Sequence, residues 1–181
     1  MRILYDYQMF STQRFGGITK YFCEIFKRIM NEHEVSLSVL ISDNYYLEAE
    51  KNLFKTKNIL PGNNFMGKRM INNKIALLNK IYSRHKILNY EYDVLHPTFY
   101  DSYFLQLRKK PFVITVHDLT LFKLNYNTQS DLHWKDNMRK IIKKASKIIS
   151  VSQNTKSDLV NILGISCDKI DVIYHGYNRR S

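Results

Sequence analysis

Short apolar segments alternate with segments of helical periodicity along the whole chain, and this alternation restricts the fold more than any other feature. The apolar segments cover residues 2–7, 34–42, 92–98, 111–118, 147–152 and 169–176. They are short and mostly continuous in apolar character, which is typical of strands buried on both faces of a parallel sheet. Strands that alternate with helices form α/β layers. We therefore predict a doubly wound, mainly parallel α/β domain of three layers.

The intervening segments predict the helices. The clearest period begins at Ile18, where apolar residues recur every three or four positions as far as Met30. Further helices are expected over 66–88, near 101–107, from about 130 to 145, and from the capping residue Ser152 to Gly164. The 66–88 segment places Met70, Ile71, Ile75, Leu78, Ile81 and Tyr82 at helical spacing. Residues 43–64 show no regular pattern.

Composition excludes several classes of protein. Hydrophobic residues make up 44% of the 181-residue chain, enough for a core, but no run of about twenty apolar residues could span a bilayer. The polar N-terminus does not fit a signal peptide, so we expect a cytoplasmic protein. Cys23 and Cys167 are too few for a disulfide framework, and neither lies in a metal-ligand spacing.

The net charge of +12 is concentrated in one window. Between Lys51 and Tyr90 there is no Asp or Glu, but there are nine Lys and Arg residues. Two interpretations stay open: a solvated basic face, or a surface that meets a phospholipid leaflet, a phosphate-bearing substrate or a nucleic acid. The apolar residues of the 66–88 helix either pack on the sheet or enter a membrane interface.

Polar residues follow several of the predicted strands. His96 follows one strand, His117 and Asp118 follow the next, and Ser152 and His175 follow the last two. Ligands of open α/β sheets bind beyond the carboxyl ends of the strands. A single histidine there is most simply structural, but three at one predicted edge indicate a site.

Two adjacent glycines, Gly16 and Gly17, open the first predicted helix within the stretch "QRFGGITKYF". Glycine is a weak choice for a helix start, where Ser, Thr, Asp or Asn usually caps. One interpretation is a tight turn that needs a positive φ. The other is an anion site, because bare backbone N–H groups at a helix N-terminus can approach a phosphate.

Four motifs together resemble a known family. In chain order they are "QRFGGITKYF" (13–22), "VITVHDL" (113–119), "ASKIISVSQNTKSDLV" (145–160) and "KIDVIYHG" (169–176). They are similar to the N-terminal half of the family-four, or group 1, glycosyltransferases of the GT-B fold. The resemblance covers essentially all of the chain and implies a Rossmann-like domain that forms one half of a GT-B fold.

The resemblance implies a retaining sugar transfer that needs neither a metal nor another cofactor. The donor would be a nucleotide-diphosphate sugar, and the acceptor a glycan or lipid-linked glycan in surface polysaccharide synthesis. The implied site residues are Gly16 and Gly17 at the donor diphosphate, the catalytic pair His117 and Asp118 beside the transferred sugar, and Lys20, His96 and Ser152 at the acceptor.

The resemblance also implies limits to what this chain does alone. The second domain of the family, which holds the nucleotide sugar, is expected beyond Ser181, so residues 1–181 would form a single N-terminal domain with little transfer activity. Two glutamates in that second domain are spaced eight positions apart in the family. Glu24 and Glu32 share this spacing, which we interpret as coincidence because both lie along the first predicted helix.

Two other classes stay open. A free-standing nucleotide-binding α/β module would bind nucleotide without a second domain. A nucleic-acid-binding protein would account for the charge, but the sequence holds no recognisable reading motif, and we expect no nucleic-acid partner. If the basic window is not simply a solvated face, we expect a peripheral position on the anionic inner face of the cytoplasmic membrane.

Overall fold

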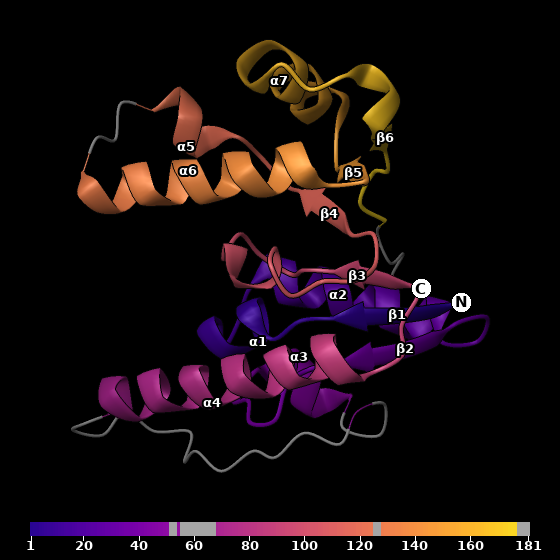
Figure 1. Ribbon diagram of the computed structural model, residues 1–181, viewed down its shortest axis with the longest axis vertical. Helices are drawn as coiled ribbons and strands as arrows, with labels where there is room; N and C mark the ends of the chain where they lie inside the picture. The colour runs from indigo at the N-terminus through magenta and orange to yellow at the C-terminus, as the bar shows by residue number, and fades with distance from the viewer. Residues whose placement is uncertain (51–53, 55–67, 125–127, 177–181) are drawn as a thin grey trace, which may run out of the picture. The chain divides into compact units, whose positions relative to one another are not determined.

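The computed structural model describes residues 1–50, 54, 68–124 and 128–176, with the side chains of 68–70 excepted. The chain divides into two compact units (Figure 1). The first comprises Met1–Phe99 and Tyr103–Pro111, and the second comprises Tyr100–Ser102 and Phe112–Ser181. Each unit contains a parallel sheet of three strands, which confirms the predicted α/β class with parallel pairing.

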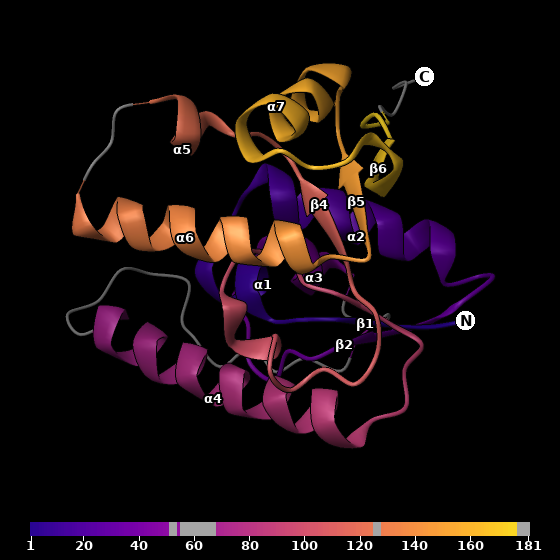
Figure 2. The same cartoon turned by 45° about the horizontal axis from the view of Figure 1, so that its top comes forward.

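In the first unit the strand order is β2-β1-β3. Its elements are β1 (Arg2–Tyr5), α1 (Gln8–Thr12), α2 (Gly17–Ile29), β2 (Glu34–Leu37), α3 (Tyr45–Ala49), α4 (Lys68–Asn89) and β3 (Val94–His96). The central position of β1 fixes the register, because Ile3 pairs with Val35 on one side and with Val94 on the other. Figures 1 and 2 show α2 and α4 on opposite faces of this sheet.

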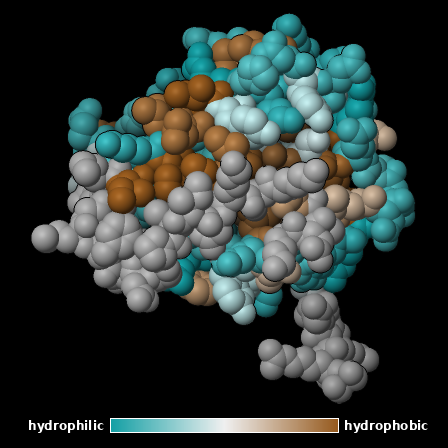
Figure 3. Space-filling view, turned by 90° about the horizontal axis from the view of Figure 1, so that it is seen from below, coloured by the Kyte–Doolittle hydropathy of each residue, from teal (hydrophilic) through white to brown (hydrophobic). Residues whose placement is uncertain are grey.

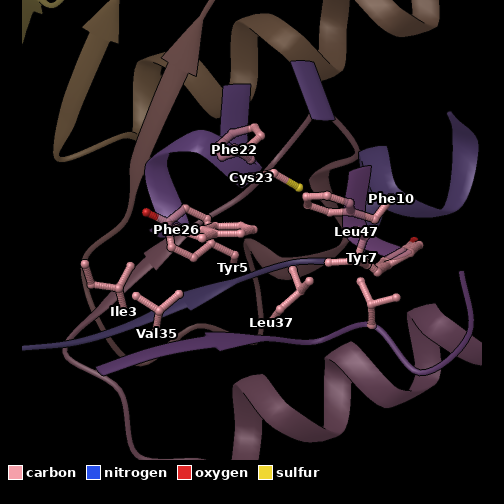
Figure 4. Packing of buried hydrophobic residues seen from close by; sticks show 11 residues of the cluster. Ile3, Tyr5, Tyr7, Phe10, Phe22, Cys23, Phe26, Val35, Leu37 and Leu47 are labelled. Carbon is pink, nitrogen blue, oxygen red and sulfur yellow. The ribbon is translucent and has the colours of Figure 1, made fainter. Parts of the chain in front are cut away.

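An aromatic core lies between α2 and the sheet (Figure 4). The ring of Tyr5 packs edge-on against Phe22 and Phe26, with centroids 5.8 and 4.7 Å apart. Phe10 adds a further ring 6.0 Å from Phe26. The apolar period predicted from Ile18 onward is confirmed, since its most central members are fully buried against β1.

Helix α4 departs from the packing that its apolar residues alone would favour. The side chains buried along it are Asn79, Ser83 and Ile87, four residues apart. Leu78 and Ile81, two members of the predicted apolar stripe, are exposed, while Ile71 and Ile75 are half-buried. The side chain of Met70 lies outside the described residues. The prediction of a helix is confirmed, and part of its apolar stripe faces away from the sheet.

The buried polar groups of α4 explain this orientation. The Asn79 amide oxygen accepts hydrogen bonds from Leu40 N and Ile41 N, at 2.9 and 3.0 Å. Its amide nitrogen donates to Ile41 O at 2.7 Å and to the Ser11 hydroxyl at 2.6 Å. Buried backbone groups need such partners. Asn79 therefore occupies the inward position because it satisfies the chain that follows β2.

In the second unit the strand order is β4-β5-β6. Its elements are β4 (Val113–Val116), α5 (Thr120–Lys123), α6 (Gln129–Lys144), β5 (Lys147–Ser150), α7 (Gln153–Leu163) and β6 (Ile170–Val172), with a short 3-10 turn at Cys167–Lys169. A second 3-10 turn, Ser102–Phe104, contains residues of both units. Figure 2 shows α6 and α7 beside β4 and β5. The buried residues include Ile114, Ile141, Ile148 and Leu159.

The ends of α7 follow the sequence prediction. The Ser152 hydroxyl accepts a hydrogen bond from Thr155 N at 3.0 Å, as an N-cap should. Gly164 ends the helix with φ of 64°, in the left-handed region that favours glycine.

Helix α3 was not predicted, because residues 43–64 carry no periodic pattern; Asn44 caps it through its side chain.

Candidate functional site

The start of α2 holds the two glycines. Gly16 is the N-cap, with an extended backbone at φ 177° and ψ 153° that any residue can adopt. Among the described residues Gly164 is the glycine with a positive φ. The tight-turn interpretation of the glycine pair is therefore wrong, and the backbone conformation does not explain why glycine occupies these positions.

The space around the two glycines differs. A Cβ added to Gly16 would overlap the end of the Gln13 side chain, which is flexible enough to move. A Cβ added to Gly17 would meet no described atom within 4 Å. Gly16 O accepts hydrogen bonds from Lys20 N and the Thr19 hydroxyl at 3.1 and 3.0 Å, so the helix starts firmly at this point. At Gly17 the start of α2 thus presents bare backbone toward open space, whereas the Gln13 side chain lies against Gly16.

The electrostatics of this helix start favour an anion. The first turn of α2 carries no acidic side chain, and Gly16 offers no side chain to cap the N–H groups. These groups carry the positive end of the helix dipole. Lys20 lies at the end of the first turn with an exposed side chain, which adds a positive charge nearby.

His96 ends β3 inside the aromatic core of the first unit. Its side chain is 5% exposed, and its ring stacks on Tyr5 with centroids 5.0 Å apart. Phe22 meets it edge-on at 5.4 Å. The ring therefore supports the core at the carboxyl edge of the sheet, and its contact with an acceptor stays a prediction.

Asp6 is a buried carboxylate at the end of β1 that the sequence patterns did not single out. It is fully buried and accepts hydrogen bonds from Thr98 N at 2.8 Å, the Thr98 hydroxyl at 2.7 Å and the Gln8 side chain at 2.7 Å. Burial raises the pKa of Asp6, while the hydrogen bonds from Thr98 and Gln8 act in the opposite direction. Its signal in the sequence is an acidic residue directly after an apolar strand.

A hydroxyl chain extends from this carboxylate. The Tyr103 hydroxyl lies 3.3 Å from Asp6 Oδ2 and 2.7 Å from the Ser83 hydroxyl of α4. The Ser83 hydroxyl in turn lies 2.7 Å from that of Ser38, which donates to Tyr5 O at 3.0 Å. The carboxyl ends of β1 and β2 are thus joined to α4 by polar side chains that satisfy one another.

In the second unit His117 follows β4 and stacks on His175. The two rings are nearly parallel, at 13°, with centroids 5.6 Å apart. Burial lowers the pKa of His117 to about 4, and the nearby His175 adds to this effect while Asp118 opposes it. The imidazole of His117 is therefore neutral at pH 7. Two of the three histidines predicted at strand ends come together here.

Asp118 and Ser152 hold the backbone around His117. Asp118 Oδ1 accepts a hydrogen bond from Thr120 N at 2.9 Å and so fixes the chain entering α5. Thr155 Oγ1, 3.0 Å from the Ser152 hydroxyl, donates to His117 O at 3.2 Å. His117, Asp118 and Ser152 therefore belong to one loop cluster in the second unit. In the first unit, Gly16, Gly17 and Lys20 lie at the start of α2, and His96 lies in the aromatic core at the end of β3.

Comparison with known proteins shows a chain of similar fold. The chain matches the crystal structure of a glycosyltransferase from Rickettsia africae ESF-5 with a TM-score of 0.55 at 20% sequence identity. The match covers 98% of this chain and 43% of that chain, so this chain spans less than half the length of the related structure. No curated protein sequence matched the chain.

The fold thus defines a Rossmann-like α/β protein. The family model of Glycosyltransferase Family 4 matches residues 15–180, which include both glycines, His96 and the loop cluster at His117. The chain belongs to Glycosyltransferase Family 4.

Proposed function

We propose that this chain is the acceptor-binding half of a retaining glycosyltransferase. The enzyme would move a sugar from a nucleotide-diphosphate sugar to a glycan or lipid-linked acceptor in surface polysaccharide synthesis. The observation that carries the proposal is the start of α2, which offers bare backbone and open space at Gly17 within a family of sugar-transferring proteins. The nucleotide would be held by a second domain, which the 43% coverage of the related structure supports.

Gly16 and Gly17 would bind the diphosphate of the donor. As the bond to the sugar breaks, negative charge grows on the leaving diphosphate. Fixed N–H donors aimed at such a developing charge stabilise the transition state. A side chain at Gly17 would occupy the space that the phosphate needs.

His117 would lie beside the transferred sugar as a neutral group. A neutral imidazole has one donor and one acceptor nitrogen, which suits a sugar hydroxyl that both donates and accepts. The lowered pKa keeps it in this form at neutral pH. Asp118 would act on the loop through Thr120 N, and Lys20, His96 and Ser152 would line the acceptor side.

The outer face of α4 supports a position at an anionic membrane on the cytoplasmic side. We define this face by the exposed residues Leu77, Leu78, Ile81 and Leu88 together with Lys74 and Arg84. Figure 3, a view from the side on which α4 lies in Figure 1, shows apolar side chains gathered on the surface. Apolar side chains flanked by cations favour the interface of an anionic leaflet. Across the described ranges, no helix is long and apolar enough to cross a membrane.

A transfer assay tests the proposal. The product of the longest reading frame that contains residues 1–181 would be incubated with UDP-, GDP-, ADP- and dTDP-sugars and a membrane extract as acceptor. We expect release of one nucleoside diphosphate together with incorporation of the sugar at an unchanged anomeric configuration. Absence of transfer from all four donors would contradict the proposal. Tight nucleotide binding by residues 1–181 alone would instead favour a free-standing nucleotide-binding module.

A further inference from the structure

Two exposed aromatic rings contact each other beside the glycines: Phe15, which directly precedes Gly16, and Tyr45 of α3. Phe15 is 57% exposed and Tyr45, the first residue of α3, is 55% exposed. Their ring centroids are 5.2 Å apart, and the ring planes differ by 31°. The guanidinium of Arg14 lies 5.4 Å from the centroid of Phe15. We call Phe15 and Tyr45 the aromatic platform.

Hydrogen bonds join the backbone before Phe15 to the backbone around Tyr45. Tyr45 N donates to Arg14 O at 2.9 Å, and the Asn44 amide donates to Gln13 O at 2.6 Å. Asn44 is 1% exposed, and its side-chain oxygen also caps α3 by accepting from Leu47 N at 3.0 Å. The exposed rings are therefore placed by a fixed backbone, which lowers the entropy lost when a ligand binds.

The platform is anchored to the core on one side only. Tyr46 packs edge-on against Tyr45 with centroids 5.6 Å apart, and it also packs against the buried cluster of the first unit. Packing alone would favour burial of the large apolar surfaces of Phe15 and Tyr45. Paired aromatic side chains that are held in place and left in solvent next to a loop point to a ligand.

We propose that the aromatic platform binds a sugar ring of the acceptor, and that this ring carries a phosphate or another acidic group. This inference rests on the proposed function and specifies its acceptor. One face of a pyranose presents C–H groups with partial positive charge, which pack on the electron-rich face of an aromatic ring. The guanidinium of Arg14, which lies 5.4 Å from the centroid of Phe15, attracts the acidic group.

The platform is tested with α-D-glucose 1-phosphate as the probe. Saturation-transfer NMR and titration on residues 1–181 would follow contact with the sugar protons and the affinity. Inorganic phosphate and methyl α-D-glucopyranoside separate the contributions of the anion and the ring. We expect the glucose 1-phosphate to bind more tightly than either part, with saturation transfer strongest to the C–H protons of one sugar face.

Matched variants assign that binding to the two rings. Phe15→Leu and Tyr45→Leu should each weaken binding of glucose 1-phosphate about fivefold, while Phe15→Tyr and Tyr45→Phe should keep it. Tyr90→Leu is the control, because Tyr90 is 45% exposed and also lies below a cation, Lys86 Nζ at 3.5 Å from its ring centroid. It should leave the affinity unchanged. Thermal melting checks that every variant remains folded.

The outcomes separate this inference from the proposed function. Unchanged affinity for glucose 1-phosphate in both leucine variants would overturn the platform as a sugar site. The same holds if the platform binds the nucleotide UMP, added as a second probe, but does not bind glucose 1-phosphate. If the longer protein transfers sugar while both variants keep the acceptor KM, the platform fails and the proposed function stands. Ring-dependent sugar binding without any transfer would support the platform and contradict the proposed function.

Discussion

At the scale of single residues, substitutions of Gly17 should lower sugar transfer without lowering the stability of the fold. A side chain there meets open space in the described part of the chain, and the backbone conformation does not require glycine. Gly17→Ala should keep or raise the free energy of unfolding by roughly 0.5 kcal/mol, since it restricts the unfolded chain. The same change should lower sugar transfer, and Gly17→Val should lower it by about tenfold or more.

Kinetics of the longer protein together with urea unfolding of residues 1–181 check this prediction. Thr12→Val, on an exposed position of the preceding segment, serves as the control for a nearby change in shape. Normal transfer by a folded Gly17→Val variant would show that the diphosphate binds elsewhere.

His117 should leave a pH signature on stability. Its pKa is about 4 in the folded chain and about 6.5 when unfolded, so the unfolded state binds more protons between these values. The contribution of the neutral ring is fully present above pH 6.5 and is lost as the pH falls toward 4. Between those two pH values, the wild type should lose on the order of 2 kcal/mol more than His117→Asn. Urea unfolding at the two pH values measures both losses. An equal loss of unfolding free energy in the wild type and in His117→Asn would contradict this prediction.

Asp6 shows what a strand pattern leaves out. Apolar periodicity predicts where β1 runs, but whether a carboxylate at its end is buried depends on Thr98, far away in the chain. Asp6→Ala would leave the Thr98 N–H and the Gln8 amide without their buried acceptor. We expect a loss of about 2 to 4 kcal/mol in the free energy of unfolding, measured in urea. Asp6→Asn retains one acceptor oxygen and should lose less unfolding free energy. An equal loss in both variants would show that the acceptor oxygens do not account for the stabilisation.

At the scale of elements, α4 marks the limit of what periodicity predicts. Its apolar spacing correctly predicted a helix but could not decide which residues face the sheet. Asn79 and Ser83 take the inward positions because they satisfy the backbone after β2 and the hydroxyl chain from Asp6. By contrast, α2 follows its pattern closely, since Phe22 and Phe26 occupy its inward face and pack in the aromatic core.

The outer face of α4 should bind anionic vesicles. Lys74→Gln with Arg84→Gln should weaken binding to phosphatidylglycerol vesicles roughly thirtyfold at low salt, because each cation near such a surface contributes about 1 kcal/mol. Leu77→Gln with Ile81→Gln should weaken binding at both low and high salt, because apolar insertion is not screened. Co-sedimentation measures both.

Two controls belong to the vesicle experiment. Lys109→Gln with Lys110→Gln removes the same charge from another exposed segment, and Ile162→Gln changes an exposed apolar residue of α7. Both should bind like the wild type. If the lysine control weakens binding as much as the α4 variant, only net charge matters; if the wild type does not bind, the basic window is a solvated face.

At the scale of the whole molecule, the alternation of strands and helices was enough to predict parallel pairing. It did not predict that the described strands pair as two sheets of three, β2-β1-β3 and β4-β5-β6. Strand order is decided by hydrogen bonds between segments far apart in sequence, such as those that join β1 to β3. The candidate site was likewise predictable only in part. The positions at the strand ends were predictable from the sequence, but the stacking of His117 on His175 and the burial of Asp6 depend on contacts between distant segments.

By itself the chain should behave as half of an enzyme. Much of the rate of a two-substrate transfer comes from holding donor and acceptor together in one geometry. Residues 1–181 span 43% of the related glycosyltransferase, and the proposed nucleotide-binding half lies outside that share. Purified residues 1–181 should therefore bind an acceptor sugar weakly and release no nucleoside diphosphate above the uncatalysed background, whereas the longer protein should turn over. Equilibrium binding and nucleotide release, measured on the same two preparations, check both halves of this expectation. Robust transfer by residues 1–181 alone would show that the donor site is already complete within this chain.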